Sequence, residues 1–415
     1  MLATRSVREQ AYILGRAGAD LMMRTGGLLN LKPLFARSGR RTIAFQAYST
    51  HLARCFAPVI TRLHETSRET SRETSSDLRI VFLLLPHPHV PFSATRELRR
   101  YVRDDLAIAE RDIFTAWQWT WARFDLLVCA DVFARFPLRR SSTVLMPHGT
   151  GLAPRWFNPH PLRKSLGDFD HLLLAGKYDF EVLLQHPQAG ALAGHARAIG
   201  FPFIDALATF PPAREQYDRR LGLTPEKPIV LFAPHHFALE MPGSIDYVRE
   251  MVQALKPLEV NLVLKLHATS FYPAMAGGQQ WRAVLDTLAR DPAVHIDEEE
   301  DHLEALRYAD VLVNDYSSRA FIFMAEHKPV VLVTPSSPNM QQENLDRMNL
   351  MRSGSRLAHS PSEAAQLVSR LLRDPTPPPD ADKIAERCFS NLWNATEPVV
   401  EFLRGELWPP SKPAS

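Results

Sequence analysis

The sequence predicts an α/β protein built from two Rossmann-like domains with parallel sheets. Its 415 residues suit two domains, since one domain usually takes about 100–200 residues. Short apolar runs alternate with stretches of helical period through both halves of the chain, as in sheets that helices cover on both faces. The alternation pauses at 211–228, where a cluster of prolines predicts a linker.

The pattern assigns most of the chain to these two domains. The expected parts are a basic segment at 1–41, the first domain at 42–210, a linker at 211–228, the second domain at 229–377, and helices and a tail at 378–415. Strands are expected at 42–48, 78–86, 124–130, 143–146, 169–175, 196–201, 229–233, 261–266, 294–297, 311–314 and 330–334. Ligands of such sheets bind beyond the carboxyl ends of the strands, so functional residues are expected there.

Composition excludes several classes of protein. A hydrophobic fraction of 45% and a charged fraction of 23% suit a globular core, and a net charge of +2 gives no overall attraction to nucleic acid. Cys55, Cys129 and Cys388 lie far apart, so neither a disulfide framework nor a zinc site is expected, and a reducing cytosol fits best. No apolar run approaches the roughly 18 residues of a membrane-spanning helix.

The first 41 residues carry many arginines with leucines and methionines between them. The arginines interrupt this segment too often for a signal peptide. One interpretation is peripheral contact with the anionic inner face of the cell membrane. The simpler one is a solvated helix packed on the first domain. The expected location is the cytoplasm, with peripheral contact at the inner face of the cell membrane left open.

A histidine follows the strand expected at 143–146, in the run MPHGTG. His148 can serve as a base because imidazole exchanges protons near neutral pH. Gly149 and Gly151 let the backbone approach a ligand closely, with Thr150 between them. The alternative is an ordinary turn histidine that bonds to local backbone.

Two potentially cationic side chains end the strand expected at 261–266, in the run KLH. Alternation along a strand places Lys265 and His267 on the same side. Two such groups at a strand end suit a phosphate. The alternative is an edge position where both reach solvent.

A polar run, NDYSS at 314–318, separates another expected strand from a helix. The N–H groups at the start of that helix, with the hydroxyls of Ser317 and Ser318, can hold a diphosphate without a metal. The alternative is a plain helix cap, since Asp and Ser are favoured capping residues.

These runs resemble the motifs of the CDP-glycerol glycerophosphotransferase family, the teichoic-acid polymerases and primases, which has a GT-B-like fold. The resemblance covers roughly residues 148–333. It rests on HGT at 148–150, GFPFID at 200–205, KLH at 265–267 and, most specifically, LRYADVLVNDYSS at 306–318. The order and spacing of these runs fit the family.

The resemblance implies transfer of glycerol phosphate, or a related polyol phosphate, from CDP-glycerol or another CDP-polyol to an acceptor hydroxyl, with release of CMP. The acceptor would be lipid-linked or a polysaccharide, in the synthesis of teichoic acid, capsule or lipopolysaccharide. The first domain would bind the acceptor and the second the donor, on either side of a cleft. No cofactor and no metal are implied.

The resemblance also implies residue roles. His148 removes the proton of the acceptor hydroxyl, and Gly149 and Thr150 contact substrate. His267, with Lys265, neutralises charge on the transferred phosphoryl group. The backbone at 316–318, from Tyr316 onward, and the hydroxyls of Ser317 and Ser318 hold the diphosphate, while Asp315 orders the turn or contacts donor hydroxyls.

The chain departs from the family pattern after the first strand of the second domain. A Pro-Thr-x-Arg-like segment is usual there, whereas this chain reads APHHF at 233–237 and has no arginine. One interpretation is that His235 or His236 replaces the arginine on a phosphate. Adjacent residues of an extended segment point in opposite directions, so a metal shared by these two is not expected.

Two other functions stay open. GT-B-like folds also serve nucleotide-sugar glycosyltransferases and epimerases, although these typically present a carboxylate to the ribose or sugar where this chain has the DYSS run. A catalytically silent scaffold of a polysaccharide assembly complex is the second, and the missing arginine alone favours it.

Overall fold

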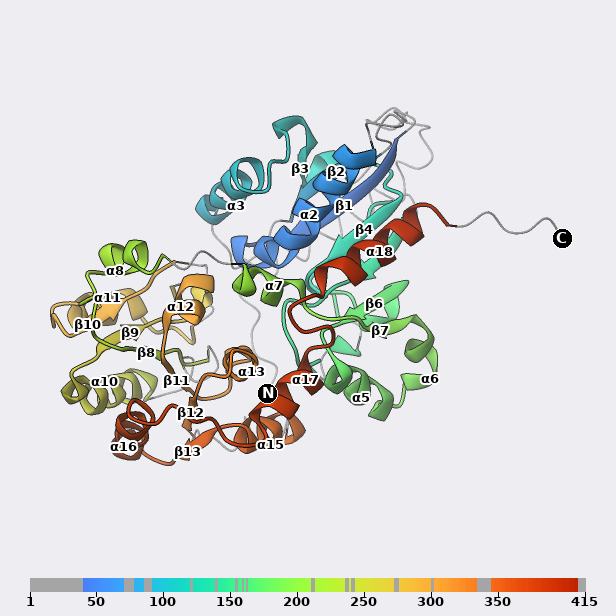
Figure 1. The fold of residues 1–415 in the computed structure, drawn as a ribbon. Helices are drawn as coiled ribbons and strands as arrows, with labels where there is room; N and C mark the ends of the chain where they lie inside the picture. Colours follow the sequence, from blue (N-terminus) through green and yellow to red (C-terminus); the bar gives the residue numbers. More distant parts are fainter. Residues whose placement is uncertain are drawn as a thin grey trace. The chain divides into compact units, whose positions relative to one another are not determined.

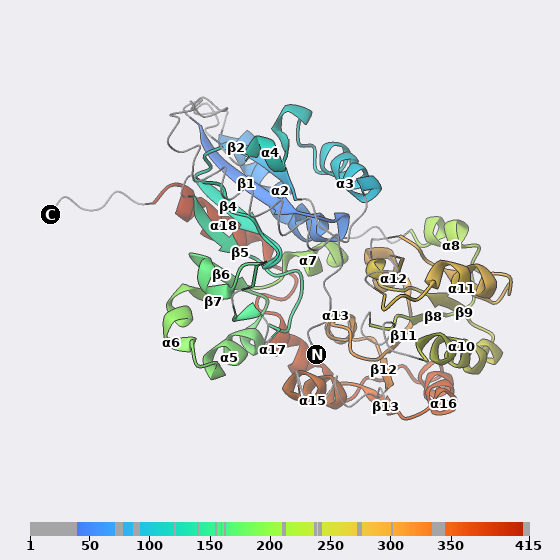
Figure 2. The ribbon, with the colours of Figure 1, turned by 180° about the vertical axis from the view of Figure 1, so that it is seen from behind.

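The computed structural model describes residues 40–70, 78–85, 92–119, 122–138, 141–153, 156–158, 160–161, 163–209, 213–235, 239, 243–271, 276–299, 302–333 and 345–409. The chain divides into two compact units. Unit 1 comprises residues 1–205 and 393–415, and unit 2 comprises residues 206–392. The ribbon of Figure 1 and its reverse in Figure 2 follow each unit's sheet and helices.

Unit 1 contains a parallel sheet, which has seven strands within the described residues. The strands are β1 (Arg41–Ala47), β2 (Leu78–Leu84), β3 (Ile113–Thr115), β4 (Leu126–Cys129), β5 (Ser142–Leu145), β6 (His171–Leu174) and β7 (Ala196–Ala198). Their order is β3-β2-β1-β4-β5-β6-β7. Alternate residues of β1 enter different cores, since Ile43 and Phe45 pack on one face and Ala44 on the other. Burial on both faces explains the nearly continuous apolar runs.

The helices of unit 1 cover this sheet. They are α2 (Thr50–Thr70), α3 (Phe92–Asp104), α4 (Ala116–Trp119), α5 (Lys177–Gln185), α6 (Ala189–Leu192) and α18 (Thr396–Leu407). The helix α7 (Pro202–Ala208) begins in unit 1 and ends in unit 2. The start of α2 is capped, because the Ser49 hydroxyl accepts from the backbone N–H of Leu52 at 3.4 Å. The final helix, α18, lies beside α2 and buries Val399 and Leu403 in the same core (Figure 1).

The run GFPFID has a structural role in unit 1. Its last residue, Asp205, accepts hydrogen bonds from the backbone N–H of Ala395 at 3.2 Å and of Thr396 at 2.7 Å. The Thr396 hydroxyl also donates to this carboxylate, at 2.6 Å. Asp205 therefore holds the N-terminus of α18, where unpaired N–H groups favour a negative charge.

Unit 2 contains a second parallel sheet, with six strands among the described residues. They are β8 (Ile229–Phe232), β9 (Asn261–Leu264), β10 (Val294–Ile296), β11 (Val311–Asn314), β12 (Val330–Val333) and β13 (Arg356–Ala358), in the order β10-β9-β8-β11-β12-β13. Its helices are α8 (Glu215–Leu221), α10 (Ser244–Leu255), α11 (Trp281–Leu288), α12 (Leu303–Tyr308), α13 (Arg319–Ala325), α15 (Leu345–Ser353), α16 (Pro361–Leu371) and α17 (Ala381–Cys388). The helix α17 packs on α13.

Both sheets reverse their strand order once. In unit 1 the chain passes from β1 outward to β3 and then returns to place β4 on the other side of β1. Unit 2 repeats this between β8 and β11. Crossovers on the two sides of such a point leave a crevice at the carboxyl ends of the strands, where ligands of open parallel sheets bind.

The structure confirms the α/β fold class and each strand expected from the sequence, with bounds that differ by a few residues at most. It adds two strands that the sequence did not predict, β3 and β13. The three cysteines are free and buried. Across the described part of the chain, none of the helices has the length and apolar character needed to cross a membrane. The basic segment predicted at 1–41 lies almost wholly outside the described residues.

Candidate active site

His148 lies beside the point where the unit 1 sheet reverses. It follows β5 by three residues, and its Nδ1 is 2.9 Å from the carbonyl oxygen of Ala130, just beyond β4. A carbonyl only accepts hydrogen bonds, so Nδ1 carries the proton and Nε2 keeps a lone pair. The side chain is 32% exposed. The ring is thus oriented as a base and open to a substrate.

Asp131 connects the ends of three strands around this histidine. Its Oδ2 lies 3.5 Å from His148 Nδ1 and accepts from the hydroxyl of Tyr48, which follows β1, at 3.4 Å. Its Oδ1 accepts from the backbone N–H of Phe133 at 2.7 Å. A carboxylate in this position can stabilise a protonated imidazole.

The loop after His148 is fixed by a buried aspartate of α5. Asp179 Oδ1 accepts from the backbone N–H of Gly151 at 2.6 Å and from the Thr150 hydroxyl at 3.4 Å. Gly151 has a φ of 98°, a region that favours glycine. Thr150 is buried, so its hydroxyl orders the loop in this structure. Substrate contact by Gly149 and Thr150 stays a prediction.

Asp315 occupies the equivalent point in unit 2. Its Oδ1 accepts from the backbone N–H of His235, which follows β8, at 2.7 Å and from that of Tyr316, which follows β11, at 2.6 Å. One carboxylate oxygen therefore ties together the two strand ends where the sheet reverses. The other oxygen, Oδ2, is buried and has no hydrogen-bond partner among the described residues.

Burial sets the charge of this site. Burial raises the pKa of Asp315 to about 6, although the backbone hydrogen bonds and the nearby Arg319 act in the opposite direction. Burial also lowers the pKa of Arg319 to about 10, so its guanidinium stays cationic at neutral pH. The guanidinium lies 3.2 Å from Nε2 of His302.

The NDYSS run forms a tight turn before α13, which has seven residues. The N–H of Tyr316 is used by Asp315, and that of Ser317 donates to Asn314 Oδ1 at 3.3 Å. The Asn314 amide donates back to the carbonyl of Ser317 at 2.9 Å. Two of the three N–H groups predicted to hold a diphosphate are thus engaged within the turn. The hydroxyls of Ser317 and Ser318 remain the predicted contacts.

Of the two histidines in the APHHF segment, one is described. The His235 ring meets the Tyr316 ring edge-on, with centroids 5.6 Å apart. His235 therefore belongs to the Asp315 site, where phosphate contact is predicted. His236 lies outside the described residues.

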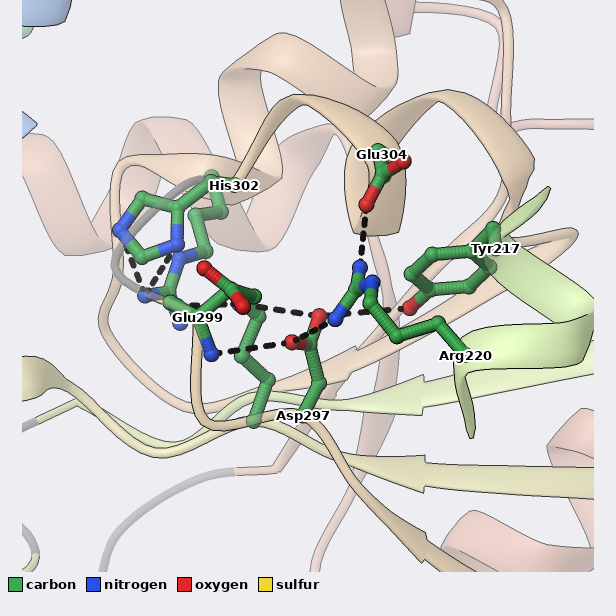
Figure 3. A network of polar contacts seen from close by, with 8 residues as sticks. Tyr217, Arg220, Asp297, Glu299, His302 and Glu304 are labelled. Carbon is green, nitrogen blue, oxygen red and sulfur yellow. Dashed lines mark hydrogen bonds and ion pairs between the residues drawn. The ribbon is translucent and has the colours of Figure 1, made fainter. Parts of the chain in front are cut away.

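Lys265 is held in a buried ion pair. Its ammonium is 2.9 Å from Asp297 Oδ2, and both side chains are 1% exposed. The same ammonium donates to the carbonyl of Glu299 at 2.7 Å. Figure 3 shows Tyr217 and Arg220 of α8 directed toward Asp297 as well, with hydrogen bonds of 3.4 and 3.3 Å. This environment favours a structural role for Lys265 over direct contact with phosphate.

His267 does not share the buried environment of Lys265. β9 ends at Leu264, so the alternation expected across the KLH run does not govern these two residues. His267 is half-buried, and its carbonyl accepts from the backbone N–H of Ser270 at 2.9 Å. Its predicted role on the phosphoryl group stays a prediction. Within the described residues, no three or more His, Cys, Asp or Glu side chains come together in a group suited to a metal ion.

Residues 191–374 match the model of the CDP-glycerol:poly(glycerophosphate) glycerophosphotransferase family. This part of the chain, a little under half of it, is similar to the domain that defines that family. It contains the unit 2 sheet and Asp315, whereas His148 precedes it. The resemblance inferred from the motifs is confirmed, and the family match indicates an enzyme, a CDP-glycerol glycerophosphotransferase.

Solved structures match almost the whole chain. The wall teichoic acid polymerase TagF, in a histidine variant, matches with a TM-score of 0.61 at 13% identity, over 97% of this chain and 98% of that one. The structure of that polymerase variant soaked with CDPG matches with a TM-score of 0.57 at 14% identity, over 96% of this chain and 97% of that one. UDP-GlcNAc 2-epimerase from Neisseria meningitidis matches with a TM-score of 0.53 at 13% identity, over 88% of this chain and 99% of that one. At these identities the likeness establishes the GT-B-like fold. No curated protein matches the chain significantly.

Sequence analysis missed several residues at these sites. Asp131 and Tyr48 are single polar residues after strands, and no local motif marks them. Asp297 is the last residue of the strand expected at 294–297, and no local motif marks it as the partner of Lys265. The available signal was their position after a strand. Only the strand order shows that Tyr48, Asp131 and His148 meet.

Proposed function

We propose that the protein transfers glycerol phosphate, or a related polyol phosphate, from a CDP-polyol to an acceptor hydroxyl in the synthesis of a cell-surface polymer, releasing CMP. The family match over residues 191–374 carries this proposal. The acceptor is a lipid-linked or polysaccharide hydroxyl of a teichoic-acid-like polymer, a capsule or a lipopolysaccharide. The position of His148 supports it independently, because an acceptor hydroxyl needs a base.

His148 acts as that base. The acceptor oxygen attacks the phosphorus next to the polyol, the bond from that phosphorus to the bridging oxygen breaks, and CMP leaves with its own phosphate. The proton of the hydroxyl passes to Nε2, since Nδ1 already donates to Ala130. Asp131 then stabilises the imidazolium. Such a transfer depends mainly on positioning and fixed charge.

Unit 2 binds the donor at the carboxyl ends of β8 and β11. Ser317 and Ser318 supply hydroxyl donors to the diphosphate, and His267 neutralises charge on the phosphoryl group that moves. Asp315 Oδ2 is placed to accept a hydrogen bond from a donor hydroxyl, since it is buried with no partner among the described residues. Lys265 does not contact the donor but stabilises the carboxyl ends of the neighbouring strands through its buried ion pair with Asp297.

One observation favours a second function. The match to a UDP-GlcNAc epimerase shows that the same fold serves uridine nucleotides in another protein. The family match argues for cytidine nucleotides here.

For the location, we propose the cytoplasm, with residues 1–41 in contact with the membrane. Unchanged membrane recovery after their deletion would remove that contact.

The test is CMP release from CDP-glycerol in the presence of acceptor candidates, for the wild type and for His148→Ala. We expect the variant to lose about 10²–10⁴-fold in kcat, the usual contribution of a general base, with an unchanged KM for the donor. His186→Ala, which removes a histidine elsewhere in unit 1, serves as the control. Transfer that survives in His148→Ala contradicts the assignment.

A further inference from the structure

We propose that Arg347 binds a phosphate of the nucleotide donor at the point where the unit 2 sheet reverses. The inference rests on the proposed function, because it names a contact that the donor makes. It concerns a residue that the sequence motifs do not mark. Arg347 lies in the first turn of α15, whereas the other residues of this site follow β8 and β11.

The position of Arg347 is defined by Tyr316. The guanidinium carbon lies 5.0 Å from the centroid of the Tyr316 ring, within the range of a cation–π contact. Tyr316 is 4% exposed, and its backbone is fixed by Asp315. The His235 ring meets the Tyr316 ring at 89°. Arg347 is therefore held by a rigid aromatic ring next to Asp315 and His235.

The charge of Arg347 is not neutralised by another side chain of the described part of the chain. The arginine forms no ion pair there, and its Nε is buried without a hydrogen-bond partner. Most buried polar groups have a partner, so a desolvated guanidinium nitrogen without one indicates a missing acceptor. The acceptor that compensates a guanidinium best is an anion.

The chemistry of the site selects phosphate among anions. A guanidinium offers parallel N–H donors that match two oxygens of a phosphate, and it stays charged at all relevant pH values. The carboxyl ends of β8 and β11 are where an open parallel sheet binds its ligand. Asp315, which bonds the backbone of Tyr316, has a second oxygen, Oδ2, that can accept a hydrogen bond from a hydroxyl. A nucleotide with a phosphate and sugar hydroxyls satisfies both groups.

Titration calorimetry with CDP-glycerol, CMP, cytidine and inorganic pyrophosphate tests the proposal. The proteins are the wild type, Arg347→Gln, Arg347→Lys and Arg352→Gln, the last removing the same charge from the same helix. We expect Arg347→Gln to weaken CDP-glycerol, CMP and pyrophosphate by tenfold or more and to leave cytidine unchanged. The affinity of Arg347→Lys for the phosphate ligands should lie between those of Arg347→Gln and the wild type. Arg352→Gln should bind all of these ligands with the wild-type affinity.

The outcomes separate this inference from the proposed function. Equal binding of phosphate ligands by Arg347→Gln and the wild type overturns the inference, as does an equal loss for cytidine, which would indicate a structural role. If the wild type binds pyrophosphate through Arg347 but no cytidine nucleotide, the proposed function fails and the phosphate contact stands. If the wild type binds none of these ligands, both fail. Thermal unfolding of each variant controls for folding.

Discussion

The two sheets reverse their strand order in the same way, yet the reversal points hold different chemistry. In unit 1 the point presents a histidine that is 32% exposed, fixed through Nδ1 by a carbonyl and a carboxylate. In unit 2 it presents a buried aspartate that ties two strand ends together. One topology therefore positions a part-exposed imidazole in one unit and a buried carboxylate in the other. The topology decides where a site lies, and the residues after the strands decide what it does.

The difference in burial predicts which property each site controls. Under the proposed function, the part-exposed His148 of unit 1 should affect the rate of reaction and contribute little to folding. Buried charges in unit 2 affect stability first, because a desolvated charge that loses its partner is costly. Mutations in the two units should separate into these two classes.

Lys265→Met should have the largest effect on stability. It removes the ammonium partner of Asp297, which is 1% exposed but keeps its contacts with Arg220 and Tyr217. Breaking a buried ion pair typically costs about 3–5 kcal/mol, and we expect the lower end of this range because Arg220 remains. The matched change in unit 1, Arg41→Met, removes a 3.2 Å pair with Asp125 whose arginine is 46% exposed, and should cost under about 1 kcal/mol. Denaturant unfolding measures both. Equal losses would contradict the contrast between the units.

Asp315→Asn should change how stability depends on pH. The pKa of Asp315 is about 6 in the folded protein and about 3.9 in an unfolded chain, so the folded state binds this proton more tightly. Stability should therefore fall as pH rises from about 4 to about 6, by about 3 kcal/mol in total, and then level off.

The Asn variant should lack this contribution, since its side chain does not titrate. Urea unfolding between pH 4 and 7 measures the slope, with Asp346→Asn, an exposed aspartate of α15, as the control. An identical slope in wild type and Asp315→Asn would show that Asp315 is not the responsible group.

Asp131→Asn should reduce kcat without changing the donor KM. We expect a loss of about tenfold to a hundredfold, smaller than the roughly 10⁴-fold loss for the aspartate of a serine-protease triad, because Ala130 still accepts from Nδ1. Steady-state CMP release measures this effect. A raised donor KM with normal kcat would place Asp131 in donor binding instead, against the division between the units.

Much of this fold could be predicted from the sequence because the strands are buried on both faces. The run VLVN at 311–314 has three apolar residues and lies between two stretches of helical period, and β11 has the same bounds. The strands β3 and β13 have three residues each and lie at sheet edges, where few apolar residues accumulate. Shortness alone does not hide a strand, since β7 and β10 are equally short, lie at the opposite edges and were predicted.

The candidate site was predictable in part. His148 and the NDYSS run could be found because each follows a strand and resembles a family motif. The alternation argument for Lys265 did not anticipate that β9 stops at Leu264 and that Asp297 holds the ammonium in the interior. Asp131 and Arg347 depend on contacts between distant segments, which a local pattern does not contain.

Titration calorimetry with CDP-glycerol on the wild type and on His148→Ala and Asp315→Asn tests the division of roles most directly. The account predicts that His148→Ala binds CDP-glycerol with the wild-type dissociation constant, whereas Asp315→Asn binds it more weakly. UDP-GlcNAc should not bind to any of the three proteins. Loss of CDP-glycerol binding in His148→Ala, with normal binding in Asp315→Asn, would contradict the account.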